Sequence, residues 1–447
     1  MMDQQRDKIT TDYLAKLTQL TIKVIVTKRR ANELQYIPQA VPFIEIEGFA
    51  YGKKGPSYTG SSHSMHLKKN WGKAVIDVGT IVFNLPEFQV AEQLITIHYT
   101  CPNVKSLLEQ YCYQLFHIIL ESPQGINMTE VGNHQQKLIV SLNGRPHPGH
   151  ATAYLNGIIV ESPEVVITPN VLVRQTNSAD LEVKNRFNDD VSFISFPTAV
   201  LEVRHEVTNE DYGIFQQTIS NYVLLLRLFK TGSVNKEFHR VKFDTVQAPH
   251  GMSSGNLPTL SVWHTYTLKK GDENFFIEFL NKLKFSYPKK PNHLSTAFDR
   301  YSESLLENVA IERRVANAIM GIEALLSKDN AELTFRLSNR AAKLLACADI
   351  DPLQTRTDLI AAYKIRSKYA HGGFIDPQQR KTGNYDNFAV TIINYLRMIL
   401  IVFIQTDLSK DELLELLDDS MIAVKKSEEL TLKITPIAEF LNTDLSN

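Results

Sequence analysis

Apolar and polar residues follow two different patterns along this chain of 447 residues. From about residue 18 to residue 270, glycine, proline and asparagine separate short runs rich in valine, isoleucine, threonine and aromatic residues, which is typical of β-strands. We expect strands at TIKVIV (21–26), AVIDVGTIVF (74–83), QLITIHYT (93–100), KLIVSL (137–142), EVVITPNVLV (164–173) and SVWHTYTL (261–268). The first part of the chain is therefore predicted to be β-rich.

Two longer segments interrupt this region as predicted helices. They are Asn103–Leu120 and Tyr212–Phe229, and their apolar residues are too numerous for a helix that lies on the surface. We expect both helices to pack against sheets.

The pattern becomes helical after the turn PKKP at Pro288–Pro291 and stays helical. Apolar residues then recur every three or four positions, which is the period of an α-helix with one buried face. The first stripe is Leu305, Val309, Val315, Ile319, Ile322 and Leu326; the second is Leu337, Ala341 and Leu344; the third is Phe388, Ile392, Tyr395 and Ile399. Four or more helices in this region predict an all-α bundle.

The predicted fold class is α+β multidomain, with a β-rich N-terminal region followed by an all-α helical bundle. The length favours two or three domains, at about 100–200 residues each. We expect a mixed α/β region of unknown type at 1–160, a β-rich region with one buried helix at 161–287, and the helical domain at 288–447. The size of the part before residue 288 suggests a sensing role.

The charge balance excludes a bulk attraction to nucleic acid or to a membrane surface. The formal net charge is −1, with 22% charged and 43% hydrophobic residues. Residues 331–385 differ, because they hold nine lysines and arginines against five acids, a formal net charge of +4. Any site for a polyanion is therefore expected to be local, and this segment is the candidate.

Arg336, Arg340 and Lys343 stand within that segment at helical spacing i, i+4, i+7, so they share one stripe. Two interpretations of the stripe remain open. It is either a surface that contacts a polyanion or a solvated face in which Glu332 pairs with Arg336.

The cysteines and the apolar stretches of the sequence predict the cellular compartment. The three cysteines, Cys101, Cys112 and Cys347, are widely spaced and odd in number, which favours a reducing compartment over a disulfide framework. The N-terminus has no apolar signal core, and Asn394 and Arg397 interrupt the longest apolar stretch. We expect a cytoplasmic protein that does not contact a membrane.

Two pairs of histidines have the spacing H-x-x-H. His63 and His66 form one pair, and His147 and His150 form the other, both in segments rich in glycine, proline or serine. Neither pair has the adjacent cysteines or carboxylates that would complete a metal shell. No metal and no cofactor is predicted, and a metal hydrolase that uses these pairs is the weakest alternative.

The octet RSKYAHGG (366–373) is the strongest candidate for a site. Residues five apart on a helix are separated by roughly 140°, so Arg366 and His371 do not share one face. A second copy across a twofold axis would bring two arginines and two histidines into one cleft. Gly372 suits the left-handed position that ends a helix, which would fix His371 in the last turn. The alternative is a solvated arginine and a helix cap.

The surrounding sequence resembles the HEPN domain family, and more closely its ApeA-like branch. YKIRSKYAHGG (363–373) follows GIEALLSKDNAELTFRLSNRAAKLLA (321–346), which has the E-A-L-L end of a long helix, an acidic linker and the form F-R-L-x-x-R-A-A-x-L-L. TPNVLVRQTNSADLE (168–182) and NYVLLLRLFKTGSV (221–234) also look like segments that precede such domains. The resemblance covers residues 290–440 well and 165–290 faintly.

This resemblance implies a metal-independent endoribonuclease that works as a homodimer, with Arg366 and His371 as catalytic residues at the interface. Ser367 stands where the family often has Asn, Asp or His, and its hydroxyl can donate and accept a hydrogen bond. Ser367 and Tyr363 are expected to support the site. Glu323 is either a buried partner of Arg366 or a surface carboxylate. The expected RNA contacts are Arg336, Arg340, Lys343, Lys364 and Lys368.

Histidine and arginine are residue types that suit the cleavage of RNA by its own 2′-hydroxyl. An RNA 2′-hydroxyl that attacks its own phosphorus needs a proton acceptor, a proton donor for the leaving oxygen and a cation near the phosphoryl oxygens. Histidines can accept and donate the proton near neutral pH, while an arginine stays charged. The resemblance places such enzymes in prokaryotic antiviral defence or toxin-like growth arrest, gated here by a trigger at the N-terminal region. The competing hypothesis is a non-catalytic HEPN-fold dimerisation and binding protein.

Overall fold

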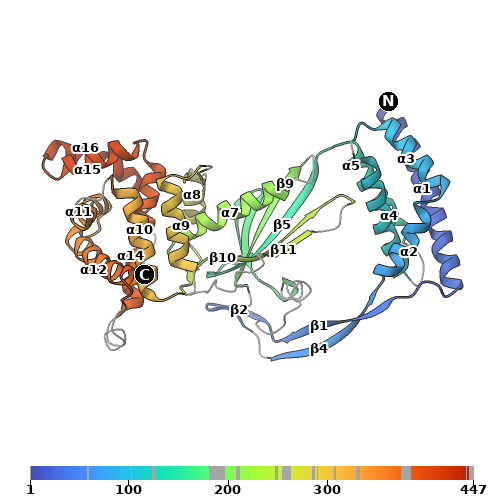
Figure 1. Ribbon diagram of the computed structural model, residues 1–447, viewed down its shortest axis with the longest axis horizontal. Coiled ribbons are helices and arrows are strands. Elements are labelled where there is room, and N and C mark those ends of the chain that lie inside the picture. Colours follow the sequence, from blue (N-terminus) through green and yellow to red (C-terminus); the bar gives the residue numbers. More distant parts are fainter. Residues whose placement is uncertain are drawn as a thin grey trace.

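The structure is a computed structural model of the whole chain. It describes all residues except 1, 58–59, 102, 123–126, 181–196, 208–211, 247–249, 254–262, 284–286, 289, 307–308, 329–332, 374–383, 439 and 442–447. The fold is mixed α and β, and the chain runs from an N-terminal group of helices through a central sheet to a second group of helices (Figure 1).

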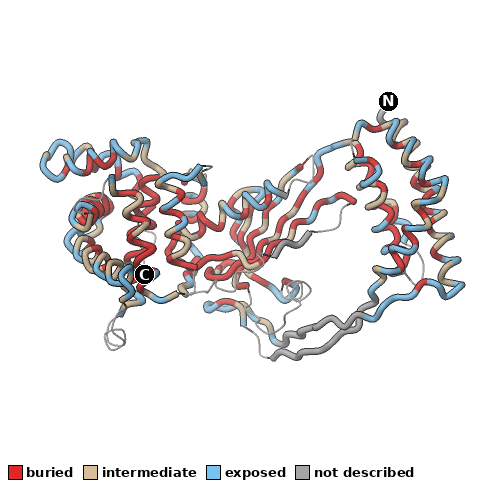
Figure 2. Tube along the Cα trace, viewed as in Figure 1, coloured by how far each residue is buried: buried red, intermediate tan, exposed pale blue. Residues whose placement is uncertain are grey.

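The N-terminal group consists of α1 (Met2–Arg30), α2 (Gly72–Val82), α3 (Pro86–His98), α4 (Val104–Glu121) and α5 (Met128–Leu142). These helices bury a core of their own, which includes Leu14, Val78, Phe88, Leu108 and Phe116, each at most 1% exposed. Figure 2 shows most buried residues of this group apart from those of the central sheet, and Val246, from the central part of the chain, belongs to the same core as these helices.

Four of the predicted strands lie in these helices, so those predictions are wrong. The runs 21–26, 74–83, 93–100 and 137–142 belong to α1, α2, α3 and α5 apart from their terminal residues. Their β-branched residues favoured strands, yet the buried positions are spaced by three or four residues, as at Phe88, Ala91 and Ile95. Burial of a helical stripe outweighed the local β-propensity. The helix predicted at 103–120 is confirmed as α4, but the expectation that it packs against a sheet is wrong, because it packs among α1, α2, α3 and α5.

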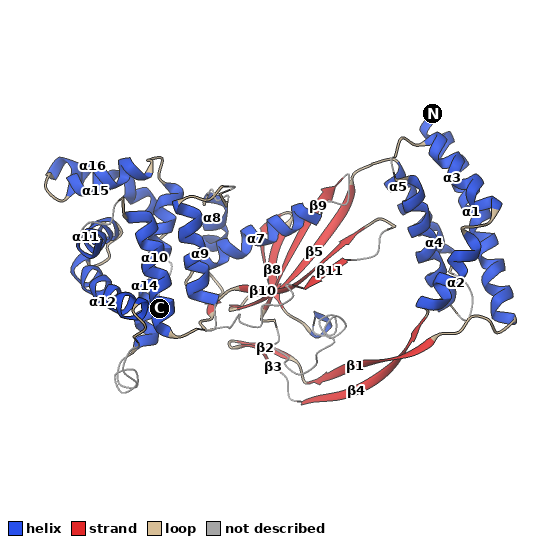
Figure 3. Cartoon of the chain, in the orientation of Figure 1, coloured by secondary structure: helices blue, strands red, loops and turns tan. Residues whose placement is uncertain are grey.

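A two-stranded ribbon connects this group with the centre (Figure 3). Its strands β1 (Ile37–Glu47) and β4 (Gly60–Asn70) pair antiparallel along their whole length. Between them, β2 (Ala50–Gly52) and β3 (Gly55–Ser57) form a short hairpin. The Tyr51 hydroxyl donates to the carbonyl oxygen of Thr198 at 2.6 Å and accepts from the amide of Val160 at 3.1 Å. The tip of the ribbon is therefore bound to the central sheet region.

The central sheet has six antiparallel strands in the order β11-β10-β5-β9-β8-β7. The strands are β5 (His147–Asn156), β7 (Glu164–Thr168), β8 (Val171–Gln175), β9 (Ala199–Val207), β10 (Asn235–Phe243) and β11 (His250–Ser253). Because β5 pairs with β9 and β10, the sheet begins at His147, earlier than the boundary predicted at residue 160. The run predicted as strand at 164–173 is extended as expected and forms two paired strands, β7 and β8.

Helix α7 (Tyr212–Phe229) packs on one face of this sheet, as expected for an apolar helix, and Phe215 contacts the ring of Phe243. Of the predicted strand at 261–268, residues 261–262 lie outside the described residues, and Tyr266–Leu268 form β12, which pairs in parallel with β6 (Ile158–Val160). Helix α8 (Glu273–Lys282) follows β12. The sheet thus has one face covered by α7.

The C-terminal part is helical, as the periodicity predicts. Its described helices are α9 (His293–Leu306), α10 (Ile311–Leu326), α11 (Leu333–Ala346), α12 (Pro352–Ala370), α14 (Tyr385–Gln405), α15 (Lys410–Ser420) and α16 (Val424–Ala438). The predicted stripe residues within them are buried, among them Ile319, Leu344 and Ile399, except Phe388 at the beginning of α14, which is half-buried.

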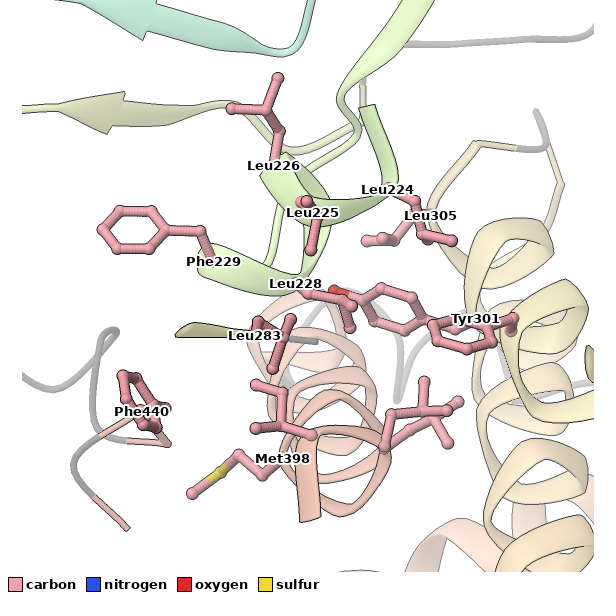
Figure 4. Close-up of a cluster of buried hydrophobic side chains, with 14 of the residues drawn as sticks. Leu224, Leu225, Leu226, Leu228, Phe229, Leu283, Tyr301, Leu305, Met398 and Phe440 are labelled. Atoms are coloured by element: carbon pink, nitrogen blue, oxygen red, sulfur yellow. The ribbon is translucent and has the colours of Figure 1, made fainter. Parts of the chain in front are cut away.

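The core of these helices continues into the central sheet without a break. Leucines of α7 pack against Tyr301 and Leu305 of α9 and Met398 of α14 (Figure 4). Arg397 of α14 is fully buried, and its Nη1 donates to the carbonyl oxygens of Leu228 at 2.9 Å and Phe229 at 3.1 Å. The secondary structure changes near residue 288, but the hydrophobic core does not end there.

Helix α14 is long and apolar enough to cross a membrane by length and composition, and the bent pair α2 and α3 meets the same test if it counts as one span. In the structure, 67% of the apolar window of α14 is buried among the other helices. A central core helix of a folded domain has this composition too.

Candidate active site

The C-terminal end of α12 carries the octet RSKYAHGG, and the way the helix ends fixes His371. The amide of Gly373 donates to the carbonyl oxygen of Lys368 at 2.8 Å, and the amide of Gly372 donates to that of Tyr369 at 2.9 Å. This pair of bonds is a Schellman motif, with Gly372 left-handed at φ +78°. The predicted role of Gly372 is confirmed, and His371 is the C-cap residue.

Arg366 lies in the last two turns of α12 and faces α10. Its Nη2 donates to Oε2 of Glu323 at 3.4 Å, and its guanidinium lies 5.6 Å from the ring centre of Tyr363. The side chains of Arg366 and Glu323 are 31% and 16% exposed. Glu323 is therefore the partner of Arg366, and Tyr363 lies against the same guanidinium.

Burial raises the pKa of the Glu323 carboxyl, and the Arg366 charge and the Tyr363 hydroxyl oppose that rise. Oε1 of Glu323 is buried, and no described residue forms a hydrogen bond with it. The carboxylate is thus held in a poorly solvated place beside a cation. Such an arrangement restrains the guanidinium at a cost in stability.

Arg366 and His371 do not form one site within a single chain. Arg366 is directed to α10, whereas His371 is exposed at the helix end. His371 instead shares a face with Lys364 and Lys368, because these three residues follow the helical spacing i, i+4, i+7 and all three are exposed. Ser367 is half-buried, and its carbonyl oxygen accepts from the amide of His371 at 3.2 Å.

The stripe on α11 differs from the predicted contact surface. Arg340 is buried, with a side chain only 4% exposed, and its Nε and Nη2 each donate to Asp418 at 2.7 Å. Arg340 therefore joins helices and is not placed to contact RNA, which corrects that prediction. Lys343 donates to the hydroxyl of Ser427 at 2.7 Å, and Arg336 is exposed. Glu332, the predicted partner of Arg336, lies outside the described residues.

A groove beside Lys364 was not predicted from the sequence. It has a volume of about 340 Å³ and is lined by Ala361, Lys364 and Ile365 of α12 and by Asn384, Tyr385 and Phe388 of α14. Phe388 was assigned to the core stripe of its helix, and it is half-buried. The signal in the sequence is the pair Tyr385 and Phe388, three positions apart at the beginning of α14.

The histidine pairs are not arranged as metal ligands where the structure describes them. His147 and His150 lie three positions apart in β5, where side chains alternate between faces, so the two rings point to opposite sides of the sheet. The side chains of His63 and His66 lie outside the described part. Among the described residues there is no group of three or more histidine, cysteine or acidic side chains that could hold a metal ion.

No protein-family model, no curated protein and no solved structure matches this chain. The resemblance to the HEPN family therefore rests on the residues quoted above.

Proposed function

We propose that this protein is a metal-independent endoribonuclease of HEPN type, with an active site formed across a homodimer of the C-terminal helices. The observation that carries the proposal is the end of α12. There a capped helix presents His371 beside Lys364 and Lys368, while Glu323 holds Arg366 on the neighbouring face. Two copies of this helix end would supply both residue types to one cleft.

The proposed reaction is a transesterification within the RNA backbone. One histidine takes the proton of a 2′-hydroxyl, which attacks the adjacent phosphorus, and the partner's copy of that histidine gives a proton to the leaving 5′-oxygen. The P–O5′ bond breaks as the new P–O2′ bond forms. Arg366 stabilises the charge that develops on the phosphoryl oxygens. The products are a 2′,3′-cyclic phosphate and a 5′-hydroxyl.

The test is incubation of RNA with the full-length protein in excess EDTA. We expect cleavage to survive chelation and to disappear in His371→Ala, while His117→Ala, which removes an exposed histidine of α4, retains it. Cleavage by His371→Ala at the rate of the unsubstituted protein would falsify the assignment. Loss of cleavage in EDTA would indicate a metal enzyme instead.

The dimer is tested separately by light scattering on the same sample. We expect the cleaving species to have the mass of two chains, because Arg366 and His371 lie on different faces of one α12. A monomer that cleaves RNA would contradict the shared site.

One observation favours the alternative, a non-catalytic HEPN-fold binding protein. Nη2 of Arg366 is bound to Glu323 on the side of α10, so one donor of the guanidinium already has a partner within the chain. A protein that binds RNA and dimerises, yet leaves RNA uncut under every tested trigger, would support this alternative.

We further propose that the protein is cytoplasmic and that its N-terminal region restrains cleavage until a phage or host component binds. Support comes from the core that α1–α5 bury largely among themselves, with Val246 as its member from the later part of the chain, because a unit with its own core can move as one body. A trigger shifts the balance only by its different affinities for the restrained and active states.

A further inference from the structure

The groove between α12 and α14 combines features that suit one base of a nucleic acid. Tyr385 and Phe388 of α14 line it opposite Ile365 of α12, and all three side chains are half-buried. A volume of about 340 Å³ lies at the lower end of the range for sites that hold small organic groups, about 300–1,000 Å³. Aromatic walls favour a flat ring, since stacking on a side chain is available to every base.

The positive charge next to the groove suits the phosphates to which a base of a nucleic acid is attached. Lys364 lines the groove itself, and Lys368 lies one turn further along the exposed face of α12. His371 follows at the helix end, about 10 Å from the level of Lys364 for a rise of 1.5 Å per residue. A chain of phosphates laid along this face would lead from the groove to His371.

The acidic side chain nearest to Tyr385 in sequence is already engaged. Asp386 accepts a hydrogen bond from Nε1 of Trp263 at 3.2 Å. Neither Asp386 nor Asp358 lines the groove, and among the described residues that do, the charged side chain is Lys364. A negatively charged ligand with flat rings complements the groove, and single-stranded nucleic acid has both features, whereas a paired duplex hides its rings.

We infer that the groove between α12 and α14 is a base-binding subsite for single-stranded RNA, in which one unpaired base stacks on Tyr385 and Phe388 while the adjoining phosphates contact Lys364 and Lys368. This inference rests on the proposed ribonuclease function, and it adds the place where one base of the substrate binds.

The test measures binding by fluorescence anisotropy with the full-length protein. The probe is a fluorescein-labelled twelve-nucleotide 2′-O-methyl oligo(A), which cannot be cut because its 2′-oxygen is blocked. We expect Tyr385→Ala to weaken binding by about tenfold, from the usual contribution of one stacked base. Tyr385→Phe keeps the ring and should bind like the unsubstituted protein. Tyr287→Ala removes an exposed tyrosine elsewhere and serves as the matched control.

The dependence of binding on salt separates the base from the phosphates. Lys364→Ala and Lys368→Ala should each lower the slope of log K against log salt by about 0.7, whereas Tyr385→Ala should leave the slope unchanged. A melting curve for each variant confirms that it is folded. A duplex of the same length should bind more weakly and should not respond to Tyr385→Ala.

Folded Tyr385→Ala that binds the probe as tightly as the unsubstituted protein would overturn the subsite. If that variant binds normally and His371-dependent cleavage in EDTA is present, the proposed function stands and only the subsite is wrong. If the unsubstituted protein neither binds the probe nor cuts RNA, both proposals fall.

Discussion

Arg366 of α12 and Glu323 of α10 form a half-buried ion pair in which burial raises the pKa of the carboxyl partner. A raised folded-state pKa means that the folded protein holds this proton more tightly than the unfolded chain. Stability then falls as the pH rises from the ordinary value of 4.5 through the folded-state pKa. At neutral pH the charged carboxylate is therefore a cost to folding.

Glu323→Gln should accordingly keep or increase the free energy of unfolding at pH 7 and yet lower RNA cleavage by about 10–100-fold, because Arg366 loses the charge that orients it. Urea unfolding and cleavage assays in EDTA measure the two effects. Glu303→Gln, at a more exposed pair with Arg300, is the matched control and should change cleavage little. Loss of both stability and cleavage in Glu323→Gln would indicate a purely structural carboxylate.

Gly372→Ala should destabilise the protein by about 1 kcal/mol, because φ is +78° although an added Cβ would meet no atom within 4 Å. The cost comes from the left-handed backbone conformation, which asparagine adopts more readily than alanine, so Gly372→Asn should destabilise the protein less. Gly132→Ala lies inside α5 with equal space and should stabilise by about the same amount. Denaturant unfolding of both variants measures whether Gly372→Ala lowers and Gly132→Ala raises the free energy of unfolding. Equal effects at both glycines would contradict the cap geometry.

Arg340→Met should lower the free energy of unfolding by about 2–4 kcal/mol, since it removes a buried guanidinium that binds Asp418 and the carbonyl oxygen of Leu326. Asp418→Asn should cost less, because Asp418 is 51% exposed. Affinity of the folded Arg340→Met variant for RNA should stay unchanged. A selective loss of RNA binding would restore the contact role predicted from the sequence.

Residues 147–447 should fold without the N-terminal helices, because the described buried residues of the core that the sheet shares with the C-terminal helices all lie after residue 147. The truncation exposes Val246, which is buried in the core of α1–α5, and removes the bond from Tyr51 to Thr198 and the ion pair of Lys137 with Asp244 at 2.8 Å. If α1–α5 restrain the nuclease, this truncated protein should cut RNA faster, and His371→Ala should cancel the gain. A folded truncated protein that is no faster would assign the N-terminal unit to recruitment or assembly.

Residues 288–447 alone are expected to fold poorly. They would lack the leucines of α7 that pack on Tyr301, and the carbonyl oxygens of Leu228 and Phe229 that satisfy buried Arg397. Circular dichroism and melting of this fragment, compared with residues 147–447, measure the difference. A cooperative transition at the temperature of the longer protein would show that the helices need no contact with α7.

Glu202 of β9 should make stability depend on acid. The 3.4 Å ion-pair contact with Nε2 of His150 and the 2.7 Å contact from Nε of Arg174 lower the pKa of Glu202 to about 2. The stabilisation is fully present above 4.5 and is lost as the pH falls from about 4.5 to about 2, up to about 3 kcal/mol. Urea unfolding of Glu202→Gln should show a deficit that shrinks over this range. A deficit independent of pH would exclude the charge as its cause.

The sequence alone determined the C-terminal helices and the end of α12. Stripes of apolar residues at helical spacing specify which positions are buried, and two glycines after His371 specify a left-handed cap. These are local properties, since each depends on neighbours within one or two turns. For Glu323 the sequence left two roles open, a buried partner of Arg366 or a surface carboxylate, because this residue lies at the margin of an apolar stripe.

The N-terminal helices show where local reasoning fails. In α2, β-branched residues favour a strand, while Ala74, Val78 and Val82 are buried at helical spacing. Which of the two patterns prevails depends on the surfaces available for packing, and those belong to α1 and α4, which are distant in the sequence.

Only the tertiary structure decided which cations are available and where the ring-lined groove lies. A stripe at i, i+4, i+7 does not reveal whether it faces solvent, and Arg340 is buried because Asp418, 78 residues later, accepts its hydrogen bonds. The groove needs α14 to lie beside α12, which periodicity within either helix cannot specify. The Arg397 contact to Leu228 spans 169 positions, and such contacts form only when packing of the whole core brings distant segments together.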